Sequence, residues 1–547
     1  MGDTLFSNKD RQQRLSESQT MTYDIIIIGG GITGAGIALD ASLRGLSVLL
    51  VEKADFASGT SSKSTKLIHG GLRYLKQFEF CLVKETGIER AVVHKNIPHL
   101  VHPEKMLLPI VKDGTFSKLS ASLAISVYER LAKVPKEHRK ITSNKSQTLV
   151  VEKLLNPELL KSSIQYSEYR TDDSRLTIEL IKAARREGAE AFNYLKVIDF
   201  KYEQDNVRGV ICKDLNSDTS IEFRAKQVVS AAGPWVDKLR EINKSKKGKT
   251  LQLTKGVHIV LPSNKLALKH SVYFDAFDGR MLFAIPRGKI TYVGTSDTNY
   301  VGDKDNVLCT EADAEYILKA INTMFEVRKL RKVDIISTWA GLRPLIHEDG
   351  KSPSELSRKD EIFVSNTNLI SIAGGKLTGF RKMAERIVDL VQEKHSDLSQ
   401  ESCKTETYKI HSDSFDNYQA FESFKNSILT KYGSRGISSY DAWYYTTTYG
   451  KHARNIIEDA LQLPIAIEQA LLKREIKYCI QYESCYNPDD YFNRRTGRIY
   501  FDIESLRDNF DFIISEFNTH FNWDSSELER IRLQSIKCIE DVTIIRP

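Results

Sequence analysis

The 547-residue chain lacks any apolar run long enough to cross a membrane, because no window approaches the roughly 18 apolar residues that a spanning helix needs. Its seven cysteines are scattered and form no C-x-x-C pair, which favours reduced thiols in a reducing compartment over a disulfide framework or a zinc site. The sequence also lacks internal repeats and a basic stripe interleaved with aromatic residues. These absences argue against a membrane-spanning protein, a disulfide-rich secreted protein and a nucleic-acid-binding protein.

Histidine and charge content add two further expectations. His94, His99 and His102 lie close together, but no carboxylate or cysteine stands at ligand spacing, so no metal is expected. Hydrophobic content of 41% and charged content of 28% are typical of a soluble globular protein. The net charge of +7 is spread along the chain and mildly favours an anionic partner, either a phosphorylated substrate or an acidic membrane surface. Residues 1–21 are polar, and we expect a flexible leader there, with a first capping helix as the alternative.

A nucleotide-binding motif lies near the start of the chain. Four consecutive isoleucines at residues 25–28 predict a strand buried on both faces. Gly29, Gly31 and Gly34 follow with the G-x-G-x-x-G spacing, where the strand would turn into a helix. Gly29 permits the tight turn, Gly31 lets a pyrophosphate approach the backbone, and Gly34 lets the helix lie close on the strand.

An acidic residue completes the motif. A second predicted strand, residues 46–51, ends at Glu52, which is placed to accept hydrogen bonds from an adenosine ribose. A glycine-rich turn between strand and helix can be purely structural. With strand, helix and acid in register, we predict a dinucleotide site whose pyrophosphate sits at the helix N-terminus.

Strand and helix signals alternate through the first 395 residues, which predicts an α/β architecture. A helix is predicted at 175–187, and two later strands end in glycine, at 228–233 and 369–375, the second leading into a helix from 378 to about 393. These returns to a strand–glycine pattern suggest a nucleotide domain built from separated segments. We assign 22–75, 165–240 and 350–395 to that domain, 76–164 and 241–349 to a mixed-sheet substrate domain, and 400–547 to a mainly helical C-terminal domain.

Two surface-type features have alternative readings. Leu119, Leu123, Val127 and Leu131 recur at every fourth position, which predicts a core-facing helix, with a membrane-surface helix as the alternative. The basic residues of loop 244–249 predict a solvated turn, with contact to anionic lipid as the alternative.

Nine segments together resemble the FAD-dependent glycerol-3-phosphate dehydrogenases, a family that includes the bacterial respiratory enzyme and the α-glycerophosphate oxidases. The first reads ASGTSSKSTKLIHGGLRYL, and the others include AAGPWVD, TKGVH, WAGLRPL, AGGKLTGFRKMAE and RRTGR. They occur in the family's order over nearly the whole chain. The resemblance implies a two-domain flavoprotein of the glutathione-reductase type with an added helical C-terminal domain. The matching segments are 57–75, 168–177, 231–237, 254–258, 278–287, 292–298, 339–345, 373–385 and 494–498.

The cofactor implied by this resemblance is FAD. The loop after Glu52 supplies short hydroxyl donors, which a flavin ring and ribityl chain need in number, although such loops are often only solvated turns. Gly374 and Gly375 open a helix whose positive end can face the flavin's pyrimidine edge, where negative charge appears on reduction. The implied cofactor-binding residues are Gly29, Gly31, Gly34, Glu52, Ser58, Thr60, Ser61, Ser62, Ser64, Gly233, Gly374, Gly375, Lys376 and Thr378.

A phosphorylated substrate needs cationic, fork-shaped donors. Arg73 and Arg343 each lie between apolar residues and glycines, where a buried arginine needs an anion, and internal salt bridges are the alternative. The resemblance places both at the substrate phosphate or its rim, with Arg343 gripping the phosphate. It adds Lys376, Tyr74 and Arg381 as further substrate-binding residues.

Oxidation of a secondary alcohol requires a general base, and histidine titrates in the right range. The candidates are His69, His258 and His347, and a structural role is the alternative for each. We favour His258, because TKGVH matches a family segment beside the flavin.

The resemblance implies oxidation of sn-glycerol 3-phosphate to dihydroxyacetone phosphate by hydride transfer to FAD. Electrons would pass to a membrane quinone, from a protein that is peripheral on the cytoplasmic face of the cell membrane, with a homodimer as a further expectation. The close alternative is an oxidase that passes electrons to O2 and yields H2O2. An amine or hydroxy-acid oxidase on the same fold, and a non-catalytic nucleotide-binding protein, are the remaining alternatives.

Overall fold

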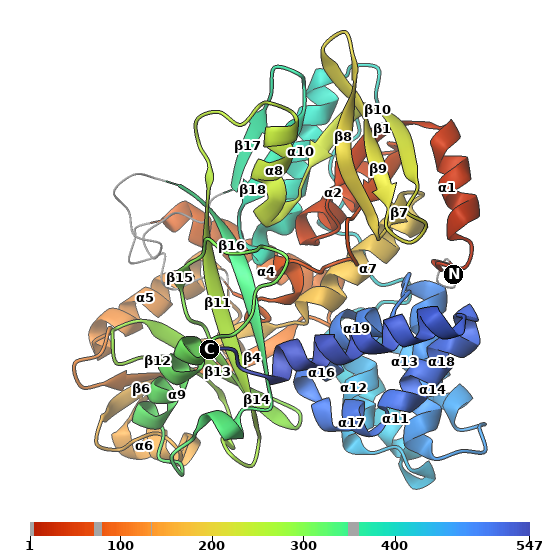
Figure 1. The fold of residues 1–547 in the computed structure, drawn as a ribbon. Coiled ribbons are helices and arrows are strands. Elements are labelled where there is room, and N and C mark those ends of the chain that lie inside the picture. Colours follow the sequence, from red (N-terminus) through yellow and green to blue (C-terminus); the bar gives the residue numbers. More distant parts are fainter. Residues whose placement is uncertain (1–4, 70–78, 133, 348–359) are drawn as a thin grey trace.

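The computed structural model describes residues 5–69, 79–132, 134–347 and 360–547. Two β-sheets form the α/β region, and a group of helices from the C-terminal third of the chain packs below the sheet of β1 (Thr22–Ile28) and beside the sheet of β11 (Leu251–Pro262) (Figure 1). The two sheets and the helices confirm the predicted α/β fold with a mainly helical C-terminal region.

The first sheet contains the predicted nucleotide-binding strands. Its central strand is β1, whose isoleucines are buried on both faces. It pairs in parallel with β2 on one side and with β10 on the other, and β18 continues the parallel part beyond β10. Strands 22–28 and 370–374 therefore meet in one sheet although they are far apart in sequence. In order, this sheet contains β17 (Asp360–Val364), β18 (Ile370–Gly374), β10 (Ser220–Ser230), β1 (Thr22–Ile28), β2 (Val48–Val51) and β7 (Glu190–Phe192), with β8 (Leu195–Glu203) and β9 (Asn206–Asp214) attached through β10.

Helices cover the first sheet and share its core. α2 (Ile32–Leu43) begins at the glycine turn, α7 (Asp173–Arg186) matches the helix predicted at 175–187, and α10 (Phe380–Lys394) matches the one predicted from 378. Ala38 of α2, Leu180 of α7 and Ile387 of α10 pack in one apolar cluster with Ile25 of β1.

The second sheet is mixed, and its strands β13 and β14 correspond to two runs, 279–286 and 290–294, whose residues predict strands. Two antiparallel pairings of ten residue pairs each, β11 with β16 and β4 with β6, are its longest. β6 crosses the expected boundary at residue 165 and belongs wholly to this sheet, as does β3. In order, it contains β15 (Thr298–Asn299), β11 (Leu251–Pro262), β14 (Ile290–Gly294), β13 (Met281–Arg287), β12 (Ser271–Asp275), β4 (His102–Val111), β6 (Leu160–Arg170) and β3 (Leu67–Ile68), with β16 (Ser337–Ile346) paired to β11 and β5 (Ile141–Asn144) paired to β6.

The helices beside the second sheet divide between two cores. Val93, near the end of α4, packs into the core of the first sheet, whereas Tyr128 of α5 packs on the second. Segment 76–164 therefore contributes to the cores of both sheets. The helices of this part are α4 (Phe80–Asn96), α5 (Lys118–Leu131), α6 (Lys145–Val151) and α9 (Glu311–Met324).

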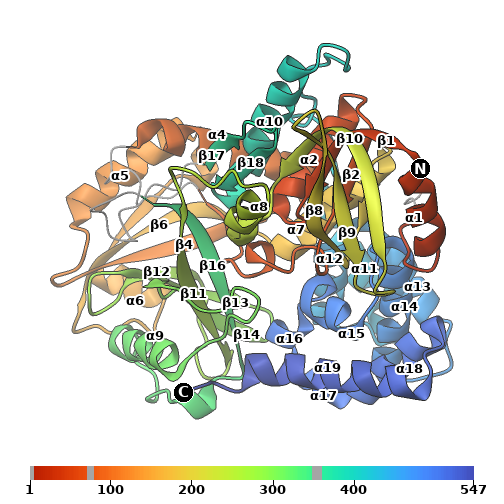
Figure 2. The same cartoon turned by 45° about the horizontal axis from the view of Figure 1, so that its top comes forward.

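The C-terminal helices do not form an isolated unit. Trp339 and Tyr292 of the second sheet lie in the same apolar cluster as Tyr449 and Tyr500 of the helical region. The last helix runs along one edge of the molecule and brings the C-terminus beside α9 (Figure 2). The helices are α11 (Tyr418–Tyr432), α12 (Ser439–Tyr449), α13 (Ala453–Ala460), α14 (Ile467–Tyr482), α15 (Pro488–Asp490), α16 (Arg498–Phe501), α17 (Ile503–Asp508), α18 (Phe510–Phe521) and α19 (Ser525–Thr543).

Two local predictions are corrected. Within the expected leader, Arg11–Thr20 form helix α1, which is held because Arg11 is buried and pairs with Asp214 at 2.9 Å. The stripe on α5 faces the core only in its second half: Leu119 is 84% exposed and Leu123 is 68% exposed, whereas Val127 and Leu131 pack against the core. Among the described residues, the structure contains no helix that is long and apolar enough to span a membrane.

Candidate functional site

A cavity of about 910 Å³ lies between the two sheets. This volume is at the upper end of the range for small-molecule and cofactor sites, roughly 300–1,000 Å³. One end is formed by the turn from β1 to α2 and by Glu52, and the other by β11, β16 and residues 374–378. The cavity is thus elongated enough to bring the nucleotide motif and the second sheet to the same ligand.

The glycine turn has the geometry that a pyrophosphate needs. Gly29 has φ of +117°, a conformation that side chains disfavour. A Cβ on Gly34 would lie 1.9 Å from the Gly29 carbonyl oxygen, so this glycine lets α2 sit against β1. Gly31 lines the cavity and precedes the first turn of α2, where unpaired amides and the helix dipole favour an anion.

Glu52 lies at the end of β2 and faces the cavity. Its carboxylate accepts hydrogen bonds from the Gly30 N–H at 2.7 Å and the Ala54 N–H at 2.9 Å. Burial raises its pKa, and these two backbone donors act against that shift. The residue is thus fixed at the place predicted for a ribose partner.

The serine-rich loop is brought to the cavity, with one exception. Ser58, Thr60, Ser61 and Ser64 line the cavity, and Ser61 Oγ accepts a hydrogen bond from the Ile32 N–H at 2.9 Å. Ser62 is buried outside the lining, and its hydroxyl donates to the Gly59 carbonyl at 3.4 Å. In the structure the Ser62 hydroxyl therefore contributes to the turn and does not reach the cavity.

Glycines of the second sheet let other groups close over it. A Cβ on Gly256 would lie 2.6 Å from the Arg343 guanidinium, and a Cβ on Gly341 would lie 2.5 Å from Lys63 Cβ. Arg343 can therefore lie across β11, and the serine-rich loop can rest directly on β16. These two close approaches bring the Arg343 guanidinium and the serine-rich loop to one wall of the cavity.

His258 also lines this wall. Its ring stacks on Trp339 at 4.7 Å between centroids, and its Nε2 lies 3.0 Å from the Thr65 hydroxyl. Burial lowers its pKa well below the usual value, and the positive charges of Arg343 and Lys66 lower it further. The imidazole is therefore neutral near pH 7 and able to accept a proton. His69 also lines the cavity, whereas His347 does not.

Of the arginines predicted to bind the substrate, Arg343 and Arg381 are described, and they have different positions. Arg343 lines the cavity, where its guanidinium pairs with Asp297 at 2.9 Å and donates to the Thr295 hydroxyl at 3.0 Å. Arg381 lies outside the cavity lining, and two of its nitrogens bond to Glu89 at 2.6 and 2.8 Å. The structure therefore does not bring Arg381 to the cavity, and its donors instead join α10 to α4.

The remaining predicted residues are mostly gathered at the same cavity. Gly233, Gly374, Gly375, Lys376 and Thr378 all line it. Gly374 and Gly375 have φ of +78° and +80°, which positions the start of the short helix 377–379 ahead of α10. Arg73 and Tyr74 lie outside the described residues.

Trp235, Lys63 and Thr65 are among the lining residues that were not predicted. Trp235 packs against Gly59, Lys63 follows the hydroxyl residues, and Thr65 contacts His258. Lys63 and Thr65 lie inside the family segment 57–75, so their position among the predicted cofactor-binding hydroxyl residues could have indicated them. Trp235 lies inside the family segment AAGPWVD, which gave the same signal.

Comparison with protein families covers almost the whole chain. The family described as FAD dependent oxidoreductase matches residues 24–380. The C-terminal domain of alpha-glycerophosphate oxidase matches residues 365–528. The two matches correspond to the α/β region and to most of the C-terminal helices.

Individual relatives are similar over their full length. The aerobic glycerol-3-phosphate dehydrogenase of Bacillus subtilis is 46% identical over 546 residues, covering 98% of each chain. That of Staphylococcus haemolyticus is 45% identical over 552 residues, with the same coverage. The X-ray structure of the glycerol-3-phosphate dehydrogenase from Bacillus halodurans complexed with FAD gives a TM-score of 0.84 at 40% identity over 98% of both chains. The L-alpha-glycerophosphate oxidase of Mycoplasma pneumoniae shares the fold, with a TM-score of 0.54 at 20% identity over 68% of this chain and 95% of its own.

Proposed function

The chain belongs to the family of FAD-dependent glycerol-3-phosphate dehydrogenases, and from this premise we propose that it oxidises sn-glycerol 3-phosphate to dihydroxyacetone phosphate with FAD as cofactor. The observation that carries the proposal is the meeting of Gly31, His258 and Arg343 at one cavity. A nucleotide-binding turn, a neutral base and a cationic fork are the three elements that this reaction requires.

FAD fits the cavity in size and chemistry. Gly31 and the first amides of α2 would hold the pyrophosphate, Glu52 the adenosine ribose, and Ser58, Thr60, Ser61 and Ser64 the ribityl chain and ring, with the start of the helix after Gly375 at the ring. Bound there, FAD supplies the hydride acceptor.

The substrate would be held by charge and deprotonated by histidine. Arg343 offers two nitrogens to a phosphate, and Lys376 adds a second positive charge on the cavity wall. His258 would accept the hydroxyl proton, because its pKa keeps the imidazole neutral. The stacked Trp339 and the Thr65 hydroxyl keep that ring oriented.

The proposed electron acceptor is a membrane quinone. The full-length similarity to aerobic dehydrogenases, at 45–46% identity, supports this choice over O2. The oxidase with similar fold is only 20% identical and matches 68% of this chain.

Helix α5 supports a peripheral position on the cytoplasmic face of the membrane. It lies at the outer edge of the second sheet (Figure 1) and exposes Leu119 and Leu123. Five exposed side chains between residues 118 and 145 are basic. Apolar side chains with basic neighbours suit an anionic lipid surface, at about 1 kcal/mol per basic residue. These basic residues are Lys118, Arg130, Lys136, Arg139 and Lys145.

Sedimentation with lipid vesicles tests this position. The protein should bind vesicles that contain anionic lipid, and Leu119→Gln with Leu123→Gln should abolish most of that binding. Leu533→Gln is the matched control, because Leu533 is also exposed but lies on α19. Equal binding by all three proteins would refute a role for α5.

An anaerobic titration with glycerol 3-phosphate tests the main proposal. The yellow protein should bleach on addition of substrate and recover its colour with a quinone analogue but only slowly with air. Fast recovery in air would instead identify an oxidase. Absence of bleaching would contradict the assignment of Arg343 and Lys376 to the substrate phosphate.

A further inference from the structure

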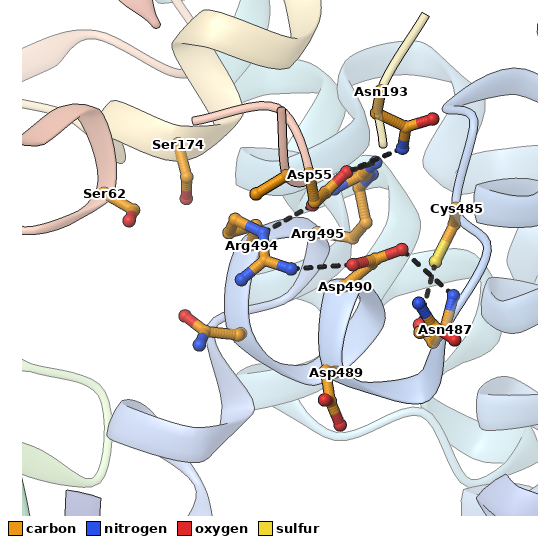
Figure 3. Close-up of polar contacts among 12 residues, drawn as sticks. Asp55, Ser62, Ser174, Asn193, Cys485, Asn487, Asp489, Asp490, Arg494 and Arg495 are labelled. Atoms are coloured by element: carbon orange, nitrogen blue, oxygen red, sulfur yellow. Dashed lines mark hydrogen bonds and ion pairs between the residues drawn. The ribbon is translucent and has the colours of Figure 1, made fainter. Parts of the chain in front are cut away.

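Asp55 has a buried carboxylate and lies in the loop that follows β2. Residues of the C-terminal region contact this loop through it. Its Oδ2 accepts hydrogen bonds from Arg494 and, at 2.7 Å, from Arg495, and its Oδ1 accepts a second one from Arg495 at 2.9 Å. Asn193 donates to Oδ1 at 3.0 Å. Figure 3 shows both arginines converging on this carboxylate from the C-terminal side.

A π-helix explains how two consecutive arginines reach one carboxylate. Consecutive side chains of an α-helix point about 100° apart. Residues Tyr491–Arg495 form a π-helix, closed by the Thr496 N–H, which donates to the Tyr491 carbonyl at 2.9 Å. The wider turn reduces the angle between Arg494 and Arg495. Single π-helical turns of this kind are frequent at functional sites.

The surrounding groups pair every charge of this cluster. Arg494 also bonds to Asp490 at 2.7 Å, and Arg495 bonds to the Glu483 carbonyl at 3.0 and 2.8 Å. Burial alone would raise the pKa of Asp55, but the two arginines outweigh it and hold that pKa below its usual value. Asp55 is therefore an anion held by two cations in a buried, electrically balanced cluster.

Asp55 begins the loop that carries the proposed flavin-binding hydroxyl groups. Its carbonyl accepts a hydrogen bond from the Ser58 N–H at 3.2 Å, and the Ala57 N–H donates to Gly30 at 2.9 Å. Farther along the loop, Lys63 Nζ lies 2.5 Å from the Tyr500 hydroxyl of α16. The loop therefore faces the cavity on one side and is held by the C-terminal region on the other.

We propose that the C-terminal region positions the cofactor loop, residues 55–65, through Asp55, Arg494 and Arg495, so that the loop has its FAD-binding shape before the cofactor binds. The three are positioning residues, since none of them lines the cavity. A preformed site loses less conformational entropy on binding, which raises affinity. The inference rests on the proposed placement of FAD against this loop.

The Asp55→Asn variant tests the proposal through FAD affinity. The dissociation constant for FAD, measured by fluorescence on deflavinated protein, should rise at least about tenfold. With FAD at saturation, the KM for glycerol 3-phosphate should stay unchanged, because Arg343 and Lys376 are untouched. Arg495→Lys keeps the charge but not the two-pronged geometry and should show a smaller loss of the same kind.

Glu483→Gln is the matched control. Glu483 is another fully buried carboxylate of the C-terminal region, and it pairs with Arg175 of α7 at 2.7 Å. This variant should lose thermal stability comparably to Asp55→Asn but keep its FAD affinity. Equal FAD affinity in both variants would show that the Asp55 cluster only joins two regions, and would overturn the proposal.

Gly31→Val separates failure of this inference from failure of the FAD placement. A Cβ at Gly31 would already lie 3.1 Å from Ser61 Oγ, so valine should exclude the pyrophosphate. If Gly31→Val keeps FAD, the placement itself is wrong. If Gly31→Val loses FAD while Asp55→Asn keeps it, only the positioning role is wrong.

Hydrogen exchange tests preformation even if a variant fails to fold. In the wild-type protein without FAD, the Ala57 and Ser58 amides should stay as protected as in the holoenzyme, because their partners are protein atoms. Fast exchange of these amides in the wild-type apoprotein would overturn the proposal.

Discussion

Arg343 and Arg381 both come from glycine-containing family segments, and both pair with a carboxylate. Arg343 pairs with Asp297 at 2.9 Å on the cavity wall, and Arg381 pairs with Glu89 at 2.6 Å between two helices. What differs is the surroundings: a glycine leaves Arg343 room beside the cavity, whereas Arg381 is enclosed. An ion pair therefore does not distinguish a ligand-binding arginine from a structural one, but its place relative to the cavity does.

The largest effect is expected at the enclosed arginine. Arg381→Met leaves the buried Glu89 without its partner, which should cost about 3–5 kcal/mol in the free energy of unfolding. Denaturant unfolding of the holoenzyme measures this loss, and the KM for glycerol 3-phosphate should not change. Arg381→Lys is the control that keeps the charge and should lose less. A raised KM with unchanged stability would show that Arg381 binds the substrate, as Arg343 is proposed to do.

At the cavity, the same kind of change should act on the substrate instead. Arg343→Ala removes the charged donor to the phosphate, and one such hydrogen bond is worth about 1.5–3 kcal/mol, so KM should rise by at least about 10- to 150-fold. Steady-state kinetics with a quinone analogue measures this rise. FAD content, read from the visible absorbance, should stay at the wild-type level. An unchanged KM would mean that Arg343 is a structural residue like Arg381.

The partner of Arg343 offers a smaller and opposite effect. Asp297 holds the guanidinium in the absence of substrate and repels a phosphate. Asp297→Asn should therefore lower KM by up to about fivefold, in line with a partly exposed ion pair worth about 0.2–1 kcal/mol. Glu89→Gln, at the Arg381 pair, should leave KM unchanged. A higher KM in Asp297→Asn would show that the aspartate chiefly orients Arg343.

The sequence was sufficient where the signal is local. Gly29, Gly31 and Gly34 could be assigned because a tight turn and a close helix contact have steric requirements that only glycine meets. The partner of Arg381 could not be predicted, because Glu89 lies 292 positions away in the sequence and only tertiary packing brings the two together. The direction of the Ser62 side chain likewise depends on how its loop folds, which residue type does not show.

Helix α5 shows how tertiary packing selects between two apolar stripes. The predicted stripe begins with Leu119 and Leu123. Ala121, Ile125 and Tyr128 form a second apolar stripe at helical spacing. The second stripe is the buried one, since Tyr128 bonds to the buried Glu168 at 2.8 Å and fixes the rotation of the helix. A pairing between residues 40 positions apart leaves no local trace in the sequence.

The smallest expected effect is a shift in the pH dependence of activity, because the pKa of His258 is lowered by burial and also by the charge of Arg343. Burial, and then the charges of Arg343 and Lys66, lower the pKa of His258, so the acid limb of kcat/KM for flavin reduction should lie below about pH 6.5. Activity is retained above the folded-state pKa and lost as pH falls through it. Arg343→Gln removes one of the lowering charges and should move the limb to higher pH, yet still below about 6.5, since burial remains the larger cause. Arg381→Met changes the net charge equally and should leave the limb in place. Equal displacement by both variants would indicate a general charge effect rather than a contact between Arg343 and the base.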